Sequence, residues 1–291
     1  MRSWLQWLAA LVPCAMPAQQ PAPRTTLESL AAEATRLAPH FADRRVAATE
    51  GYRRLGADFP GMGEHWLQSG QLLLDRIDPA RPTLLMYATI ADTPTLLGVG
   101  FVTTTHGLTP ATDVPGWPDA WHEHSGLLAD ESGVAPGGAG ASDTHVWILH
   151  VWTTMPNPDG KFSPDNWSLP FARERLEVSA RPGADAGRAL ALLSAGDAYL
   201  RNVLTDARVR VPANEARVDA AIVASRSRVA SITSGARNAG GATVSDVDAL
   251  GREWQSLARA LREIIGPQVE RYLEPPHPAA GTGHQHDAPR P

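Results

Sequence analysis

The sequence predicts an α+β protein with N-terminal helices, a central antiparallel β-domain and a C-terminal antiparallel helical bundle. A helix-start signal lies near residue 25, short β-like runs occupy the middle, and apolar residues recur every three or four positions in the last third. The chain has 291 residues, of which 43% are hydrophobic and 20% are charged. This length and composition are typical of a globular protein with a substantial core.

Residues 1–18 have the features of a signal peptide. Arg2 supplies positive charge, residues 4–12 form a short apolar stretch, and residues 15–18 are small enough for cleavage. The apolar stretch is too short to anchor the mature chain, so we expect a periplasmic or secreted protein without a transmembrane anchor. Lipidation of Cys14 is the alternative, although Pro13 fits a lipoprotein signal poorly.

Cleavage after residue 18 would remove Cys14, the single cysteine of the chain. The mature protein would then have neither a structural disulfide nor a thiolate site. Histidine, aspartate and glutamate would remain as ligands for a metal ion.

Residues 25–55 are expected to form an N-terminal helical segment. Thr25-Thr26-Leu27-Glu28 resembles a capping box, with a hydroxyl at the start and a carboxylate three residues later. Pro39 fits the first turn of a second helix, because a proline inside a helix costs about 3 kcal/mol. We expect this second helix to run to about Leu55 and to end at Gly56.

Residues 59–178 are predicted to form the β-rich domain. Its β-like runs are Thr83–Ile90, Thr95–Thr104 and Thr144–Thr154. The first two are joined by a short turn-rich connection, which indicates an antiparallel hairpin. The segments 133–142 and 155–170 are rich in turn-forming residues and are expected to be loops.

Residues 184–273 are predicted to form the helical bundle, because apolar residues follow three-and-four spacings. The three stripes are Leu190, Leu193, Leu200 and Leu204; Val218, Ile222, Ser225, Val229 and Ile232; and Val247, Leu250, Trp254, Leu257, Leu261 and Ile264. Such heptads serve packing within or between chains equally well, so they leave the oligomeric state open. Residues 274–291 are hydrophilic and rich in proline, which indicates a disordered tail.

Four histidines lie beside tryptophans in the middle of the chain: His65, His122, His124 and His150. Strand alternation places His150 and His145 on opposite faces, whereas His122 and His124 share a face if that segment is extended. We expect the four histidines to bind a divalent transition metal, Zn, Cu, Fe or Mn. The neighbouring Glu64 could then act as a ligand or as the general base of a metal-dependent hydrolase or oxygenase.

Other interpretations fit the same residues. A buried histidine beside a tryptophan is also typical of a hydrogen-bonded core residue. A non-enzymatic module could bind a small-molecule ligand in a pocket lined by Trp66, Trp117, Trp121, Trp147 and Trp152. An envelope scaffold acting through the heptad helices is a third interpretation. The net charge of −5 provides no basic surface for a nucleic acid, which we do not expect as a partner.

Five spaced motifs occur in one order between residues 35 and 166: Gly51-Tyr52, Gly61-Met62-Gly63-Glu64-His65-Trp66, the hairpin of residues 84–102, Leu149-His150-Val151-Trp152, and Asn157-Pro158-Asp159-Gly160-Lys161-Phe162. This order resembles an uncharacterised family of secreted, mainly bacterial, proteins. The resemblance implies a shared domain and a pairing of His65 with His150, but no reaction. The chain departs from the family at Asn166-Trp167, where many members have Asn-Pro, and in its helical C-terminal third.

Overall fold

The computed structural model describes residues 25–74, 76–106, 109–123, 145–178, 180–194, 212–269 and 273. The predicted signal peptide, the predicted loop at 133–142, the predicted tail and His124 lie outside these residues. Leu200 and Leu204 of the first predicted heptad stripe do so as well.

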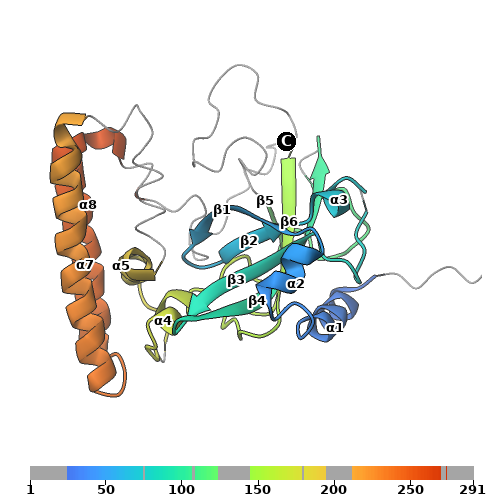
Figure 1. Cartoon of the computed structure of the whole chain (residues 1–291), viewed down its shortest axis with the longest axis horizontal. Helices are drawn as coiled ribbons and strands as arrows, with labels where there is room; N and C mark the ends of the chain where they lie inside the picture. Colours follow the sequence, from blue (N-terminus) through green and yellow to red (C-terminus); the bar gives the residue numbers. More distant parts are fainter. Residues whose placement is uncertain are drawn as a thin grey trace, which may run out of the picture.

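The order of elements confirms the α+β prediction, with helices first, a sheet in the middle and helices last (Figure 1). The first half contains α1 (Leu27–Leu37), α2 (Arg44–Thr49), β1 (Arg53–Phe59), β2 (Gly63–Leu67), α3 (Ser69–Leu72), β3 (Leu84–Ile90), β4 (Thr93–Thr105) and β5 (Trp121–Glu123). The second half contains β6 (His145–Trp152), α4 (Leu169–Arg173), α5 (Ala184–Ser194), α7 (Glu215–Asn238) and α8 (Val244–Ile265). Short 3-10 turns occur at Pro212–Asn214 and Pro267–Val269.

The N-terminal helices are shorter than the sequence predicts. The capping box of α1 is formed by Thr26 and Ser29, whose hydroxyls satisfy each other's backbone amides, and not by Thr25 and Glu28. The second helix was predicted to reach Leu55, but this prediction is wrong. It ends at Thr49, and the chain then turns at Gly51, where φ is +91°, into strand β1. Pairing with β2 therefore determines the conformation of residues 53–59, as tertiary context commonly does.

The sheet has six strands in the order β1-β2-β3-β4-β6-β5, and each neighbouring pair is antiparallel. The predicted hairpin is confirmed as β3 and β4. Its turn consists of Ala91 and Asp92, which have φ values of +50° and +67°. Positive φ at both central residues is the conformation that matches the natural twist of a two-residue hairpin.

The two faces of the sheet are covered by different parts of the chain. Helices α1 and α2 lie on one face (Figure 1), over the buried side chains of Leu85, Tyr87, Val99, Phe101, Leu149 and Val151. The opposite face carries Leu84, Met86, Leu97, Val102, Ile148 and Trp152, together with Leu169 of α4. We call the first the helix-covered face and the second the histidine face, because the second also carries the histidines described below.

The C-terminal helices form their own core. Helices α7 and α8 run side by side as a long hairpin with α5 next to it (Figure 1). The predicted stripe on α8 is confirmed, since Leu250, Trp254, Leu257 and Leu261 are buried. On α7 the buried positions are Ile222, Ser225, Val229, Thr233 and Ala236, so the stripe continues through Thr233 and Ile232 is only partly buried. In the described part of the chain, no helix combines the length and apolar character needed to cross a membrane.

Candidate metal centre

Three of the four predicted ligand histidines converge on the histidine face. The ring centroids of His65 and His150 are 5.4 Å apart, and those of His122 and His150 are 4.7 Å apart. His65 and His150 are completely buried and His122 is 7% exposed. The structure therefore brings together one histidine from each of β2, β5 and β6, with His150 in contact with both of the others.

Strand register explains why the three side chains share a face. His122 on β5 lies opposite Ile148 on β6, and His150 is two residues further along the same face of β6. His65 on β2 lies opposite Met86 on β3, which also belongs to the histidine face. Directly opposed residues of an antiparallel pair point to the same side.

Two glycines on β4 leave room on this face between β3 and β6. A Cβ atom at Gly100 would lie 2.9 Å from Cδ2 of Leu84 and 3.4 Å from Cδ2 of His150. A Cβ atom at Gly98 would lie only 2.2 Å from the carbonyl oxygen of Val151. Glycine inside a strand commonly marks such a close approach. The packing around His150 therefore depends on the small residues of β4.

A hydrogen bond fixes the orientation of His150. Its Nδ1 atom lies 2.6 Å from the carbonyl oxygen of Pro164. Because a carbonyl oxygen only accepts, Nδ1 must carry the proton, and in a neutral ring Nε2 then carries the lone pair. The next residue on this face, Trp152, is held in the same way, since its Nε1 donates to the carbonyl oxygen of Ser163 at 2.8 Å. One loop therefore orients both side chains.

Asparagines hold this loop in place. Asn166 is completely buried, its amide group donates to the carbonyl oxygen of Pro156 at 3.0 Å, and its backbone N–H donates to that of Gly61 at 2.8 Å. Asn157 donates to the carbonyl oxygen of Asp165 at 2.8 Å. The sequence indicated a loop here but gave no role to these asparagines. The only available signal was the presence of Asn near both ends of a short proline-containing segment.

Aromatic rings flank the histidines. The centroid of the Phe59 ring is 5.3 Å from that of His65, and the centroid of the Trp152 ring is 6.3 Å from that of His150. Both aromatic side chains are at least nine-tenths buried. The rings of the histidine cluster therefore lie in a largely apolar environment, where an electrostatic or coordinating interaction is stronger than in water.

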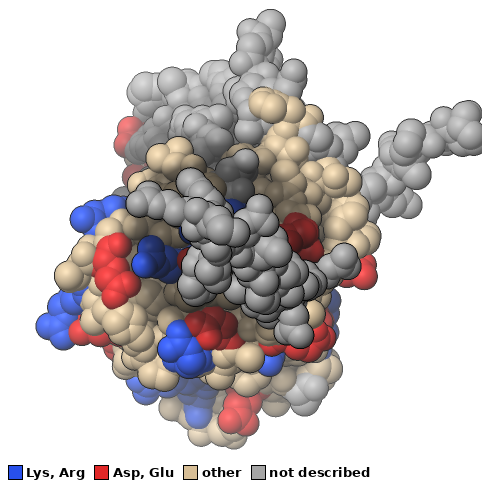
Figure 2. Space-filling model, turned by 90° about the vertical axis from the view of Figure 1, so that its right-hand side faces the viewer, with Lys and Arg blue, Asp and Glu red and all other residues tan. Residues whose placement is uncertain are grey.

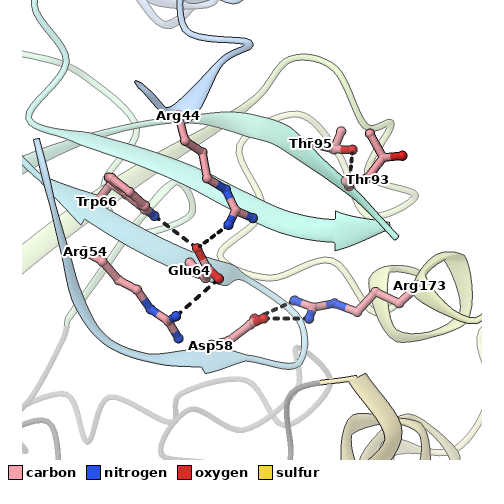
Figure 3. A network of polar contacts seen from close by, with 8 residues as sticks. All are labelled: Arg44, Arg54, Asp58, Glu64, Trp66, Thr93, Thr95 and Arg173. Carbon is pink, nitrogen blue, oxygen red and sulfur yellow. Dashed lines mark hydrogen bonds and ion pairs between the residues drawn. The ribbon is translucent and has the colours of Figure 1, made fainter. Parts of the chain in front are cut away.

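The structure separates Glu64 from this cluster. Glu64 precedes His65 on β2, so its side chain points to the helix-covered face. Figure 3 shows its carboxylate between two arginines: Arg44 Nη1 is 3.3 Å from Oε2, and Arg54 Nη1 is 3.4 Å from Oε1. Trp66 Nε1 also donates to Oε2, at 3.1 Å. These contacts engage both carboxylate oxygens in a charge network away from the histidines.

A second carboxylate, that of the partly buried Asp58, connects the edge strand β1 to α4. Asp58 forms a bidentate ion pair with Arg173 of α4 (Figure 3). Arg173 Nη1 donates to Asp58 Oδ2 at 2.7 Å, and Nη2 donates to Oδ1 at 2.5 Å. The Arg173 side chain is only 1% exposed. The pair ties α4 to the strand that also carries Phe59, the aromatic neighbour of His65. Sequence reasoning missed this pair, because nothing in the sequence links two residues so far apart.

The five tryptophans of the alternative pocket are divided between the two faces. Trp66, Trp121 and Trp147 pack in the core of the helix-covered face, whereas Trp152 belongs to the histidine face. Trp117 lies edge-on to Trp147, with ring centroids 4.7 Å apart. The described residues therefore do not bring these five side chains together around one cavity.

The conformation described here has no preformed metal centre. No group of three or more His, Cys, Asp or Glu side chains among the described residues has the spacing of a metal site. His124, the fourth predicted ligand, lies outside the described residues. The three rings are thus close together without forming such a group among the described residues.

No protein-family model matches the chain, and no curated protein or solved structure resembles it significantly. On the face shown in Figure 2, acidic and basic side chains are interspersed, without a broad area of one sign. The features that point to a function are therefore those of the buried histidine cluster itself.

Proposed function

We propose that the protein binds one divalent transition metal ion (Zn, Cu, Fe or Mn) through His65, His122 and His150. The observation that carries this proposal is the spacing of the three rings around His150, 4.7 Å and 5.4 Å between centroids. Two imidazoles that bind one tetrahedral zinc through bonds of about 2.0 Å have centroids roughly 5 Å apart. In this proposal His150 keeps the orientation set by Pro164, and His65 and His122 turn about their side-chain bonds to direct one nitrogen each toward the metal.

The hydrogen bond of His150 also supports this proposal. A histidine that binds a metal commonly donates its other ring N–H to a carboxylate or a backbone carbonyl, which fixes its tautomer. His150 makes such a bond through Nδ1 to Pro164, so Nε2 is the atom that we assign to the metal. In this arrangement the loop of residues 155–168 acts as the outer shell of the centre.

Three protein ligands would leave at least one coordination position for another group. His124 can fill it, because it follows His122 by two residues, and the site would then be closed and structural. If water fills it, the metal would lower the pKa of that water or bind an oxygen-containing substrate, as in a hydrolase or an oxygenase. We assign no general base, because the Glu64 carboxylate is held among arginines on the other face.

The N-terminal sequence supports a place of action outside the cytoplasm. A charged start, a short apolar stretch and small residues before Gln19 favour export to the periplasm or secretion. The family resemblance supports a domain shared with other secreted proteins. A histidine site suits such a compartment, because it does not depend on a reduced thiol.

The deciding experiment measures metal content by elemental mass spectrometry on the full chain without an affinity tag. The tail histidines His277, His284 and His286 are replaced by serine so that they contribute no metal. We expect about one metal ion per chain after exposure to a metal-replete buffer, and loss of this ion in a His65→Ala/His150→Ala variant. The matched control is His145→Ala/His40→Ala, since these histidines pair with Glu123 and Glu50 outside the cluster.

Folding of each variant is checked by circular dichroism and by thermal unfolding. A folded wild-type protein that takes up no metal would overturn the proposal. Equal metal content in the cluster variant and the control variant would also overturn it. A fourth measurement, on His124→Ala, separates the closed site from the open one, because only the closed site loses affinity when His124 is removed.

A further inference from the structure

A cavity of about 330 Å³ lies in the C-terminal helical part, between α5 and α8 and away from the histidine cluster. Figure 1 shows α5 beside the α7–α8 hairpin, outside the sheet. Seven of the eight lining residues come from these two helices, and the eighth is Leu273: Asp185, Arg188, Trp254, Gln255, Ala258, Arg259, Arg262 and Leu273. Its volume is within the range of small-molecule sites.

One stripe of α8 forms most of the wall. Trp254, Ala258 and Arg262 follow one another at intervals of four residues, and Gln255 and Arg259 lie beside them. Trp254 is 7% exposed, and with Ala258 and Leu273 it supplies an apolar part. The cavity therefore has an aromatic wall at one position and guanidinium groups at others.

The charges in the cavity do not balance. The lining contains three arginines and one carboxylate, Asp185. Both oxygens of this carboxylate are already engaged, one by Arg188 Nη1 at 2.9 Å and the other by Gln255 Nε2 at 3.2 Å. No carboxylate of the described residues forms an ion pair with Arg259. Arg259 thus adds a positive charge to a concave, partly apolar space.

We propose that this cavity binds a small organic anion that carries two negative charges on oxygen atoms, such as a phosphate monoester or a dicarboxylate. The guanidinium group presents paired N–H donors that match two oxygens of a phosphate or a carboxylate. Arg259 and Arg188 would hold the charged end, and Trp254 would contact the apolar part. This site is independent of the metal centre and needs no metal.

The test uses isothermal titration calorimetry on the full chain with two probes, phenyl phosphate and glutarate. Benzyl alcohol is the neutral probe of similar size. We expect saturable binding of at least one dianion with one site per chain, weaker at higher ionic strength, and no comparable binding of benzyl alcohol. Binding of phenyl phosphate alone would assign the phosphate class, and binding of glutarate alone would assign the dicarboxylate class.

The variant Arg259→Gln removes one guanidinium from the cavity, and we expect it to weaken binding about tenfold or more. The matched control is Arg252→Gln, an exposed arginine of the same helix that does not line the cavity. Both positions are exposed, so neither change disturbs the core, and circular dichroism verifies the fold.

Absence of saturable binding of both dianions would overturn the proposal. Equal weakening by the two variants, or equal affinity for benzyl alcohol, would do so too. Addition of a chelator should leave the affinity unchanged, so failure of the metal proposal does not affect this result.

Discussion

The rings of His122 and His150 meet nearly edge to face, at an angle of 64° and with centroids 4.7 Å apart. His122 lies opposite Ile148, so His150 is its diagonal neighbour across the β5–β6 pair. Diagonal neighbours on one face of a sheet contact each other only when the side chains are long or aromatic. Two imidazoles satisfy this condition. His150 also contacts His65, so the arrangement of the three rings depends most on the orientation of His150.

Asn166→Ala is expected to weaken metal binding without removing a ligand. The change deletes the amide group that fixes the loop at Pro156, and the loop carries the Pro164 carbonyl that orients His150. Loss of an outer-shell partner typically lowers metal affinity by about 10- to 100-fold. Competition with a chromophoric chelator measures the affinity.

The control for Asn166→Ala is Asn214→Ala, because Asn214 also donates to a carbonyl oxygen, that of Ile264, but in the C-terminal helices. Both variants lose an amide-to-carbonyl hydrogen bond of similar length, and Asn166→Ala also removes the oxygen that accepts two hydrogen bonds from Ser168. If both retain wild-type affinity, the loop has no part in orienting His150.

Glu64→Gln is expected to reduce stability and to leave metal affinity within about twofold of the wild type. The carboxylate is nine-tenths buried between Arg44 and Arg54, and its neutralisation leaves the partly buried guanidinium of Arg44 without its counter-charge. Such a loss costs about 1–3 kcal/mol. Urea unfolding measures the stability and chelator competition the affinity. Glu50→Gln, at an exposed contact with His40, is the control. Lost metal with unchanged stability would instead place Glu64 in the metal centre.

Arg173→Met is expected to destabilise the fold by about 3–5 kcal/mol, because it leaves Asp58 with an uncompensated, mostly buried charge. Arg175→Met is the matched control, since Arg175 forms an exposed pair with Asp92 at 3.7 Å, a type of pair worth about 0–1 kcal/mol. The double variant Asp58→Leu/Arg173→Met should recover much of the lost stability. Equal unfolding midpoints for Arg173→Met and Arg175→Met would show that the Asp58–Arg173 pair contributes no more than the exposed pair.

The sequence predicted those parts of the fold whose signals are local. The β3–β4 hairpin and the buried stripe of α8 depend on residues that are neighbours in the chain or a few positions apart. The prediction failed at residues 53–59, where β1 forms only because β2 pairs with it. A run such as Arg53-Arg54-Leu55 carries no strong preference of its own, so a contact outside the segment decides its conformation.

The site was predictable in part for the same reason. Alternation along a strand correctly separates His145 from His150, and it equally separates Glu64 from His65 once residues 63–67 are known to be a strand. The partnership of Glu64 with Arg44 and Arg54, by contrast, joins α2, β1 and β2, and no spacing in the sequence encodes it. Sequence motifs therefore indicate which residues could form a site, but they do not show which side chains from other strands and helices will contact them.

Two buried tyrosines are expected to make the protein sensitive to alkaline pH. The hydroxyl of Tyr52 donates to the carbonyl oxygen of Pro82, and that of Tyr87 donates to the carbonyl oxygen of Phe41, each at 2.6 Å. Burial raises the pKa of both phenols well above the usual value, because the charged phenolate would lose its solvation.

The sign of the pH effect follows from proton binding. In the unfolded chain both phenols ionise near pH 10, whereas the folded protein holds their protons to higher pH. Above about pH 10 the unfolded state therefore binds fewer protons, and the free energy of unfolding falls as pH rises, by up to about 1.4 kcal/mol per pH unit for each tyrosine. The stabilising contribution is fully present below pH 10.

The variant Tyr52→Phe/Tyr87→Phe separates this effect from general alkaline damage. At pH 7 it should be less stable than the wild type by about 1 kcal/mol for each lost hydrogen bond. Between about pH 10 and 12 its stability should fall less steeply, because the two groups that ionise only on unfolding are gone. Urea unfolding at several pH values gives both quantities. Parallel pH profiles for the two proteins would mean that Tyr52 and Tyr87 ionise equally readily in the folded and unfolded states.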